Sequence, residues 1–159
     1  MNCCGDILIG GLSDIIVCGG KTYAVNTDFK IILDILHKAE TGSSLAELAP
    51  LFFSGEIPSD PGDAMEKFIG REYLPAPNSV FSFFYDAGLI IGAFMECYNI
   101  DLLECDMHWK KFTALFMSLN GKTAFSQLIR CRCADFSDPA SRTAARRISA
   151  KYDRRFLDI

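Results

Sequence analysis

The sequence contains few of the residues and motifs that enzymes use most often. It has only two histidines, His37 and His108, and no G-x-x-x-x-G-K-[ST] or G-x-G-x-x-G stretch. A nucleophilic triad needs a histidine beside a serine or cysteine, and a phosphate site of the common kind needs a glycine-rich loop. The acidic residues are scattered, so no carboxylate pair stands out for acid–base chemistry. We therefore expect a protein that is not an enzyme and binds no cofactor.

Both histidines have a structural explanation. His37 falls in the polar last turn of a predicted helix, where it can face the helix C-terminus. His108 falls on an apolar stripe beside Trp109, which favours a half-buried, hydrogen-bonded core residue over a catalytic one. A metal site could be drawn from Cys105, His108, Cys131 and Cys133. The C-x-C spacing of the last two is not that of common zinc sites, so we expect no bound metal.

Long apolar runs and a regular cysteine pattern are also missing. The seven cysteines are odd in number and irregularly spaced, which argues against a disulfide framework and favours a reducing, cytoplasmic setting. The first ten residues have no basic region and include Asp6, so we expect no signal peptide. The most apolar stretch, Val80–Tyr98, is interrupted by Asp86 and Glu96 and is too short for a span of about 20 apolar residues. We expect a buried helix and no membrane association.

Charge is distributed unevenly along the chain. Residues 1–106 carry sixteen acidic and five basic residues, whereas residues 107–159 carry four acidic and eleven basic ones. Such asymmetry indicates that the basic end meets an acidic surface. Three alternatives follow, in order of preference: the acidic part of the same chain, a protein partner, or nucleic acid. The net charge of −4 gives nucleic acid no general support.

The pattern of apolar residues predicts a mainly α fold with an N-terminal β-hairpin. At 159 residues we expect a single domain of about six helices. Its expected parts are a hairpin region (1–27), a first helical lobe (28–71), core helices (80–135) and a basic C-terminal helix (138–159). Gly19-Gly20 lies between two β-branched runs and predicts the hairpin turn.

Local signals predict where helices begin and end. The segment Asn26-Thr27-Asp28 offers a cap for a helix that runs to about Glu40. Ser44 and Glu47 form a capping-box pattern, and Asp60 precedes Pro61. Pro50 implies that the second of these helices is short or starts late. In the core region, a helix ending at Tyr98 should reach the next one through an elbow at residues 99–102. Asp101 or Asp106 is expected to cap that next helix, and Thr123 the one after it.

Several short segments resemble the bacteriophage gene-product-fifteen family. The first is Tyr23–Lys30 (YAVNTDFK), at the end of the predicted hairpin. The others are Tyr98–Leu102 (YNIDL), His108–Phe112 (HWKKF) and the stretch from Ile129 to Arg132. They occur in the order typical of the family and extend over nearly the whole chain.

This resemblance implies a phage tail-morphogenesis protein. Family members are similar to tail assembly chaperones that hold the tape-measure protein soluble while the tail tube polymerises. The implied partners are the tape-measure protein and the tail tube protein, the implied location is the cytoplasm of the bacterial host, and a homo-oligomer is compatible with this role. The alternatives are a structural tail or connector component retained in the virion, which would use the hairpin edge for strand addition, and a nucleic-acid-binding regulator.

Two groups of residues are candidates for partner binding. Trp109, Phe112 and Phe116 could line an apolar groove that captures a helix, although core packing is the favoured role for each. The residues that could supply an electrostatic contact are Arg142, Arg146, Arg147 and Lys151. Alternatively, this basic group is the solvated face of a helix that docks on its own domain, and the sequence does not separate the two interpretations.

Overall fold

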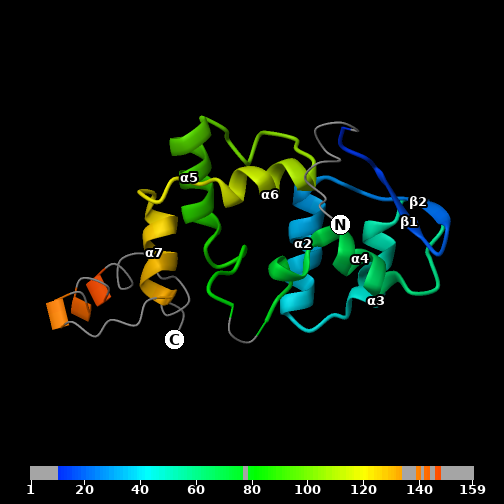
Figure 1. Ribbon diagram of the computed structural model, residues 1–159, viewed down its shortest axis with the longest axis horizontal. Helices are drawn as coiled ribbons and strands as arrows, with labels where there is room; N and C mark the ends of the chain where they lie inside the picture. Colours follow the sequence, from blue (N-terminus) through cyan, green and yellow to red (C-terminus); the bar gives the residue numbers. More distant parts are fainter. Residues whose placement is uncertain (1–10, 77–78, 134–138, 141, 144–145, 148–159) are drawn as a thin grey trace. The chain divides into compact units, whose positions relative to one another are not determined.

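The chain forms a β-hairpin followed by short α-helices (Figure 1). The structure is a computed structural model, and it describes residues 11–76, 79–133, 139–140, 142–143 and 146–147. The elements named in these residues are β1 (Ile15–Cys18), β2 (Lys21–Ala24), α2 (Phe29–Glu40), α3 (Leu45–Phe52), α4 (Pro61–Ile69), the 3₁₀ turn η1 (Arg71–Tyr73), α5 (Ala87–Tyr98), α6 (Trp109–Met117) and α7 (Ala124–Cys133). Six α-helices and one two-stranded sheet in this part of the chain confirm the expected mainly α class.

The hairpin has the turn that its sequence predicts. β1 and β2 are antiparallel, with Cys18 opposite Lys21 at the closed end and Ile15 opposite Ala24 at the open end. Gly19 and Gly20 both have positive φ, at 57° and 77°. Only glycine adopts this conformation without steric cost, and two such residues in succession match the twist of the flanking strands.

The predicted caps of the first three helices are confirmed. The Asp28 carboxylate accepts a hydrogen bond from the backbone N–H of Lys30 at 2.7 Å. Ser44 and Glu47 form a reciprocal capping box, and Asp60 caps α4 directly before Pro61. α3 is only eight residues long and includes Pro50. Each cap is worth about 0.5–2 kcal/mol because it satisfies backbone N–H groups that lack a partner within the helix.

The connection between α5 and α6 differs from the prediction. α5 ends at Tyr98, where Asn99 is left-handed with φ 53°, but α6 begins only at Trp109, so the connection is longer than the expected elbow. The Asp101 carboxylate accepts from the backbone N–H of Leu103 and closes a turn instead of capping α6. His108 takes the capping role, because its Nδ1 accepts from the backbone N–H of Lys110 at 3.0 Å. The prediction that Asp101 or Asp106 caps α6 is therefore wrong.

The chain divides into two compact units. The first comprises Met1–Pro75 and Asp106–Thr113, and the second comprises Ala76–Cys105 and Ala114–Ile159, so that the division falls within α6. The single-domain organisation expected from the chain length stays a prediction. Each unit has a core of its own, and the two cores are built differently.

In the first unit, two motifs far apart in the sequence meet at the beginnings of two helices. The backbone N–H of Phe29, the first residue of α2, donates to the Met107 carbonyl at 2.9 Å. The backbone N–H of Trp109, the first residue of α6, donates to the Thr27 carbonyl at 2.6 Å. Each segment thus satisfies an N–H group that the other helix leaves without an internal partner. The ring of Phe29 also stacks on that of Phe112, with centroids 5.0 Å apart.

The second unit is centred on α5 and α7. Ile90 and Phe94 of α5 and Leu128 of α7 are buried in it, and the two helices are in contact. Thr123 caps α7 as predicted, because its hydroxyl accepts from the backbone N–H of Ser126. The Tyr98 hydroxyl donates to the Leu115 carbonyl at 2.8 Å. Burial, together with the nearby Cys97, raises the pKa of Tyr98 above its ordinary value.

Candidate partner-binding surface

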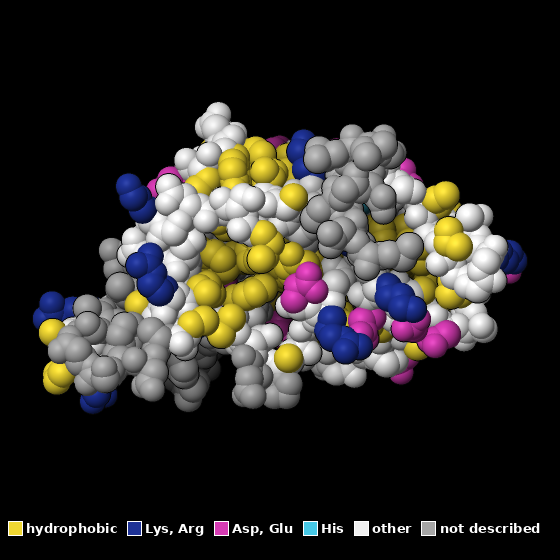
Figure 2. All heavy atoms as spheres, viewed as in Figure 1, with side chains coloured by type: hydrophobic (Ala, Val, Ile, Leu, Met, Phe, Trp, Pro, Cys, Tyr) yellow, Lys and Arg dark blue, Asp and Glu magenta, His cyan; other side chains and the backbone are white. Residues whose placement is uncertain are grey.

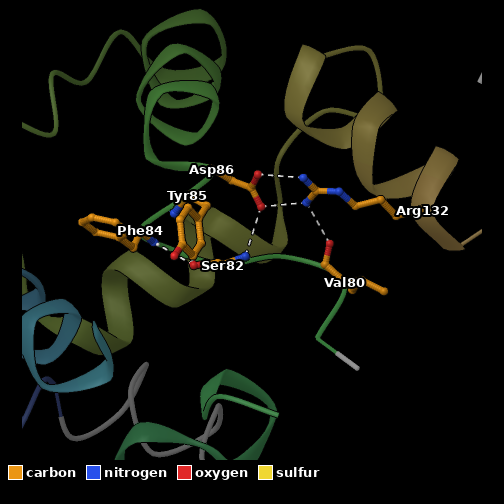
Figure 3. Close-up of polar contacts among 6 residues, drawn as sticks. All are labelled: Val80, Ser82, Phe84, Tyr85, Asp86 and Arg132. Atoms are coloured by element: carbon orange, nitrogen blue, oxygen red, sulfur yellow. Dashed lines mark hydrogen bonds and ion pairs between the residues drawn. The ribbon is translucent and has the colours of Figure 1, made fainter. Parts of the chain in front are cut away.

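A buried ion pair holds the segment before α5 against α7 (Figure 3). Two guanidinium nitrogens of Arg132 donate to the two carboxylate oxygens of Asp86, at 2.7 and 2.9 Å. The side chains of Asp86 and Arg132 are 0% and 8% exposed. Arg132 also donates to the Val80 carbonyl at 2.9 Å, and Asp86 accepts from the backbone N–H of Ser82 at 3.0 Å. These bonds give both buried charges several partners, which such charges require.

The same segment presents aromatic rings at the surface. Phe84 is 53% exposed and Tyr85 is 43% exposed, and their rings meet edge to face with centroids 5.2 Å apart. The Ser82 hydroxyl accepts from the backbone N–H groups of both residues. Figure 2 shows hydrophobic side chains gathered over the segment that leads into α5. An ordered polar network therefore supports an exposed apolar surface.

An open groove lies in the second unit. Its volume is about 260 Å³, and it is lined by Val80, Phe81, Phe116, Met117, Leu119, Phe125, Ser126 and Ile129. Phe116 belongs to an aromatic cluster, with its ring 5.3 Å from that of Phe81 and 5.4 Å from that of Phe125. Met117 is 70% exposed. The groove thus has an aromatic base and a large flexible apolar side chain open to solvent.

The charged residues in the segment that supplies six of the eight groove residues are all positive. The segment from Ala114 to Cys133 contains Lys122, Arg130 and Arg132 and no acidic residue. Lys122 and Arg130 are both exposed, and Arg130 donates to the Gly121 carbonyl at 2.9 Å. Arg132 is paired with Asp86, so Lys122 and Arg130 are the exposed cations of this segment that carry no ion pair with it.

The structure separates the three aromatic residues that the sequence singled out. Trp109 and Phe112 are fully buried in the core of the first unit, whereas Phe116 lines the groove of the second and is 7% exposed. The Trp109 indole N–H donates to the Ile69 carbonyl at 2.9 Å, and its ring stacks on Phe112 at 5.5 Å. Trp109 and Phe112 therefore pack in a core, and a role for these residues in partner binding stays a prediction.

The basic candidates lie near the end of the described chain. Arg142, Arg146 and Arg147 are helical and exposed. Lys151 lies outside the described residues. Contact between this group and a partner stays a prediction.

His108 has hydrogen-bond partners at both ring nitrogens. Its Nδ1 accepts from Lys110, so the proton of the neutral ring is on Nε2, which donates to the Ser13 carbonyl at 3.3 Å. Its side chain is 10% exposed. This arrangement matches the interpretation of His108 as a half-buried, hydrogen-bonded core residue, and it places the ring at the start of α6.

No group of three or more His, Cys, Asp or Glu side chains in this part of the chain is placed to hold a metal ion. Likewise, none of the described helices is both long enough and apolar enough to cross a membrane.

Sequence reasoning missed the ion pair and most of the groove. The signal for Asp86 was present, since an acid within an aromatic run such as FSFFYD is buried only with a compensating cation. The sequence did not reveal which cation, because Arg132 lies 46 residues away.

Comparisons with known proteins agree with the resemblance seen in the sequence. No curated protein and no protein of solved structure matches the chain. The family described as "Bacteriophage Gp15 protein" matches residues 57–154, which is more than half of the chain. The matched range includes the YNIDL and HWKKF segments, the ion pair and every groove residue, whereas the Tyr23–Lys30 segment lies outside it. The chain therefore belongs to the bacteriophage Gp15 protein family.

Proposed function

We propose that this protein is a non-enzymatic phage tail assembly protein that acts as a chaperone for the tape-measure protein. Its family makes it a phage protein, and the resemblance of its motifs to tail-morphogenesis proteins supports the finer role. A chaperone of this kind needs a surface that holds apolar helical segments. It acts in the cytoplasm of the bacterial host, before the tail is complete.

The observation that carries the proposal is the open apolar groove in the second unit. It lies within the part of the chain that the family model matches. Grooves of this kind bind amphipathic helices, whose apolar side chains insert at every third or fourth position. Phe116 lies in the groove, and the exposed Met117 is able to adapt to different partners. In this proposal the arginines at 142, 146 and 147, together with Lys151, add an electrostatic contact with the same partner.

Co-expression tests the proposal directly. The tape-measure protein of the same phage is produced alone, with this protein, and with a Met117→Glu variant, and its soluble fraction is measured. We expect the wild-type chain to raise that fraction and Met117→Glu to lose most of the gain, because a carboxylate in the groove opposes the entry of an apolar side chain.

The matched control is Met95→Glu. Met95 is also an exposed methionine of the second unit, but it lies on α5 and does not line the groove. This variant should retain the activity of the wild type. No change in tape-measure solubility with the wild-type chain would overturn the chaperone proposal, and equal losses in both variants would remove the groove from it.

One observation favours a second role, that of a structural component kept in the virion. β1 exposes the side chains of Ile15 and Val17, and among the described residues it pairs only with β2. In this second role its other edge would add a strand of a neighbouring protein. Mass spectrometry of purified virions separates the two roles. A stoichiometric amount of this protein in mature particles supports the structural role, and its absence supports the chaperone.

A further inference from the structure

We infer that the groove binds a helix whose apolar stripe is flanked by acidic side chains. This inference rests on the proposed function, because it specifies the chemistry of the partner segment at the same groove. Three properties of the groove support it: its size, its lack of available polar groups and the charge around it.

The size of the groove fits side chains of a polypeptide better than a small molecule. Sites for small molecules usually enclose about 300–1,000 Å³, whereas this groove is open and measures about 260 Å³. Seven of its eight lining residues are apolar, and three of these are phenylalanines. Such a surface accepts one or two large apolar side chains from a partner that lies across it.

Two polar groups at the groove already have hydrogen-bond partners within the chain. Ser126 is the one polar lining residue, and its hydroxyl accepts from the Thr123 hydroxyl at 2.9 Å. The Val80 carbonyl accepts from Arg132. An extended segment would bring backbone N–H and C=O groups that need partners when they are buried. A helix satisfies these groups internally, so it is the form of chain that this groove accepts.

Charge decides which kind of amphipathic helix fits. Lys122 lies in the loop between α6 and α7, and Arg130 lies next to the lining residue Ile129. No acidic residue occurs between Ala114 and Cys133, and the carboxylate of Asp86 is neutralised by Arg132. A partner with Asp or Glu beside its apolar stripe gains attraction here, whereas one with Lys or Arg is repelled. The groove therefore discriminates between helices with the same apolar side chains.

Two designed peptides test the inference with the full chain. Both carry the same leucine stripe and form amphipathic helices, but one has Glu and the other Lys at the flanking positions. Binding is measured by fluorescence anisotropy at low and at high salt. We expect the Glu peptide to bind roughly tenfold tighter at low salt, with the difference shrinking as salt screens the charges.

Charge reversal at the groove is the second arm of the test. Lys122→Glu/Arg130→Glu should invert the preference between the two peptides. Lys21→Glu/Lys67→Glu is the matched control, because it changes two exposed lysines of the first unit by the same total charge. The control should keep the preference of the wild type, and Met117→Ser should weaken both peptides alike.

Several outcomes would overturn the inference: no binding of either peptide, equal binding, or tighter binding of the Lys peptide. Sedimentation at the concentrations of the binding assay tests a further outcome that would overturn the inference. If a second copy of the chain fills the groove, the protein sediments as an oligomer and does not bind the Glu peptide. A chain that solubilises the tape-measure protein but shows no charge preference would refute this inference alone. A chain that shows the charge preference but does not solubilise the tape-measure protein would refute only the proposed function.

Discussion

The two units of this protein use buried polar groups in different ways. In the first unit Trp109 makes a buried neutral contact, in which its indole N–H donates to a carbonyl, and two helix starts exchange backbone hydrogen bonds. In the second unit the contact is ionic, between Asp86 and Arg132. The first unit buries its large aromatic residues Trp109 and Phe112, while the second exposes Phe84 and Tyr85. The difference is compatible with the proposed function, in which the first unit is a scaffold and the second, held by an ion pair, carries the proposed interaction surface.

Loss of the buried cation should have the largest effect. Arg132→Leu leaves the carboxylate of Asp86 buried without its partner, and we expect the free energy of unfolding to fall by about 3–5 kcal/mol. Urea denaturation followed by circular dichroism measures this loss. Hydrogen exchange should also rise in α5 and α7 more than in α2 to α4.

A double variant separates charge from packing. Asp86→Leu/Arg132→Leu removes both charges and should recover much of the stability lost in Arg132→Leu, because no unpaired ion remains. If the double variant is as unstable as the single one, the ion pair is not what holds the segment before α5.

The neutral contact of the first unit should be less costly to remove. Trp109→Phe takes away the donor to the buried Ile69 carbonyl, and we expect a loss of about 1–3 kcal/mol in the same urea experiment. Lys111→Ala, on the exposed side of the same helix, is the control and should change stability by no more than about 0.5 kcal/mol. A larger loss for Trp109→Phe than for Arg132→Leu would reverse the proposed contrast between the units.

A smaller effect, dependent on pH, is expected at Tyr98. Removing its hydrogen bond to Leu115 by Tyr98→Phe should cost about 0.5–1.5 kcal/mol at neutral pH. Because burial raises the pKa of Tyr98 in the folded chain, the unfolded chain loses this proton first, at a pH of about 10. The stabilisation is therefore complete below that pH and declines as pH rises through the folded pKa.

Urea midpoints at several alkaline pH values test this assignment. The wild type should lose stability more steeply above pH of about 10 than Tyr98→Phe does. Parallel curves for the two proteins would show that Tyr98 does not cause the alkaline loss.

The smallest effect on stability is expected at the exposed surface of the second unit. Met117→Ser should change the free energy of unfolding by no more than about 0.5 kcal/mol, because the side chain is already 70% exposed. The same variant should weaken the capture of helical peptides. A large loss of stability would mean that Met117 serves the core, and the contrast between scaffold and interaction surface would fail at this position.

Local structure was largely predictable from the sequence. The Gly19-Gly20 turn, the Asp28 cap and the Ser44–Glu47 capping box were all correct. Each of these depends on residues no more than four positions apart, so the chemistry that forms it is visible in a short window. The cap of α6 was predicted wrongly. Asp101, Asp106 and His108 can each accept a hydrogen bond from the first turn of a helix, and the path of the chain between α5 and α6 decides that His108 lies at its start.

The candidate site was predictable only in part. Phe116 was named from the helical spacing of the apolar residues, and it does line the groove. Trp109 and Phe112 lie on the same stripe but are buried in the core of the first unit. Periodicity reports that a residue faces apolar surroundings, and it does not distinguish a core from a groove.

By itself, the sequence determined most of the helices and the hairpin, the mainly α class and the family motifs, because these follow from local propensity, capping and apolar spacing. Only the tertiary structure decided which of these pieces meet. It joins Asp86 to Arg132 across 46 residues and brings the Tyr23–Lys30 segment against the start of α6. Contacts of this kind depend on how the whole chain folds around its apolar side chains. The partners of a buried charge are therefore fixed only when the chain is fully packed.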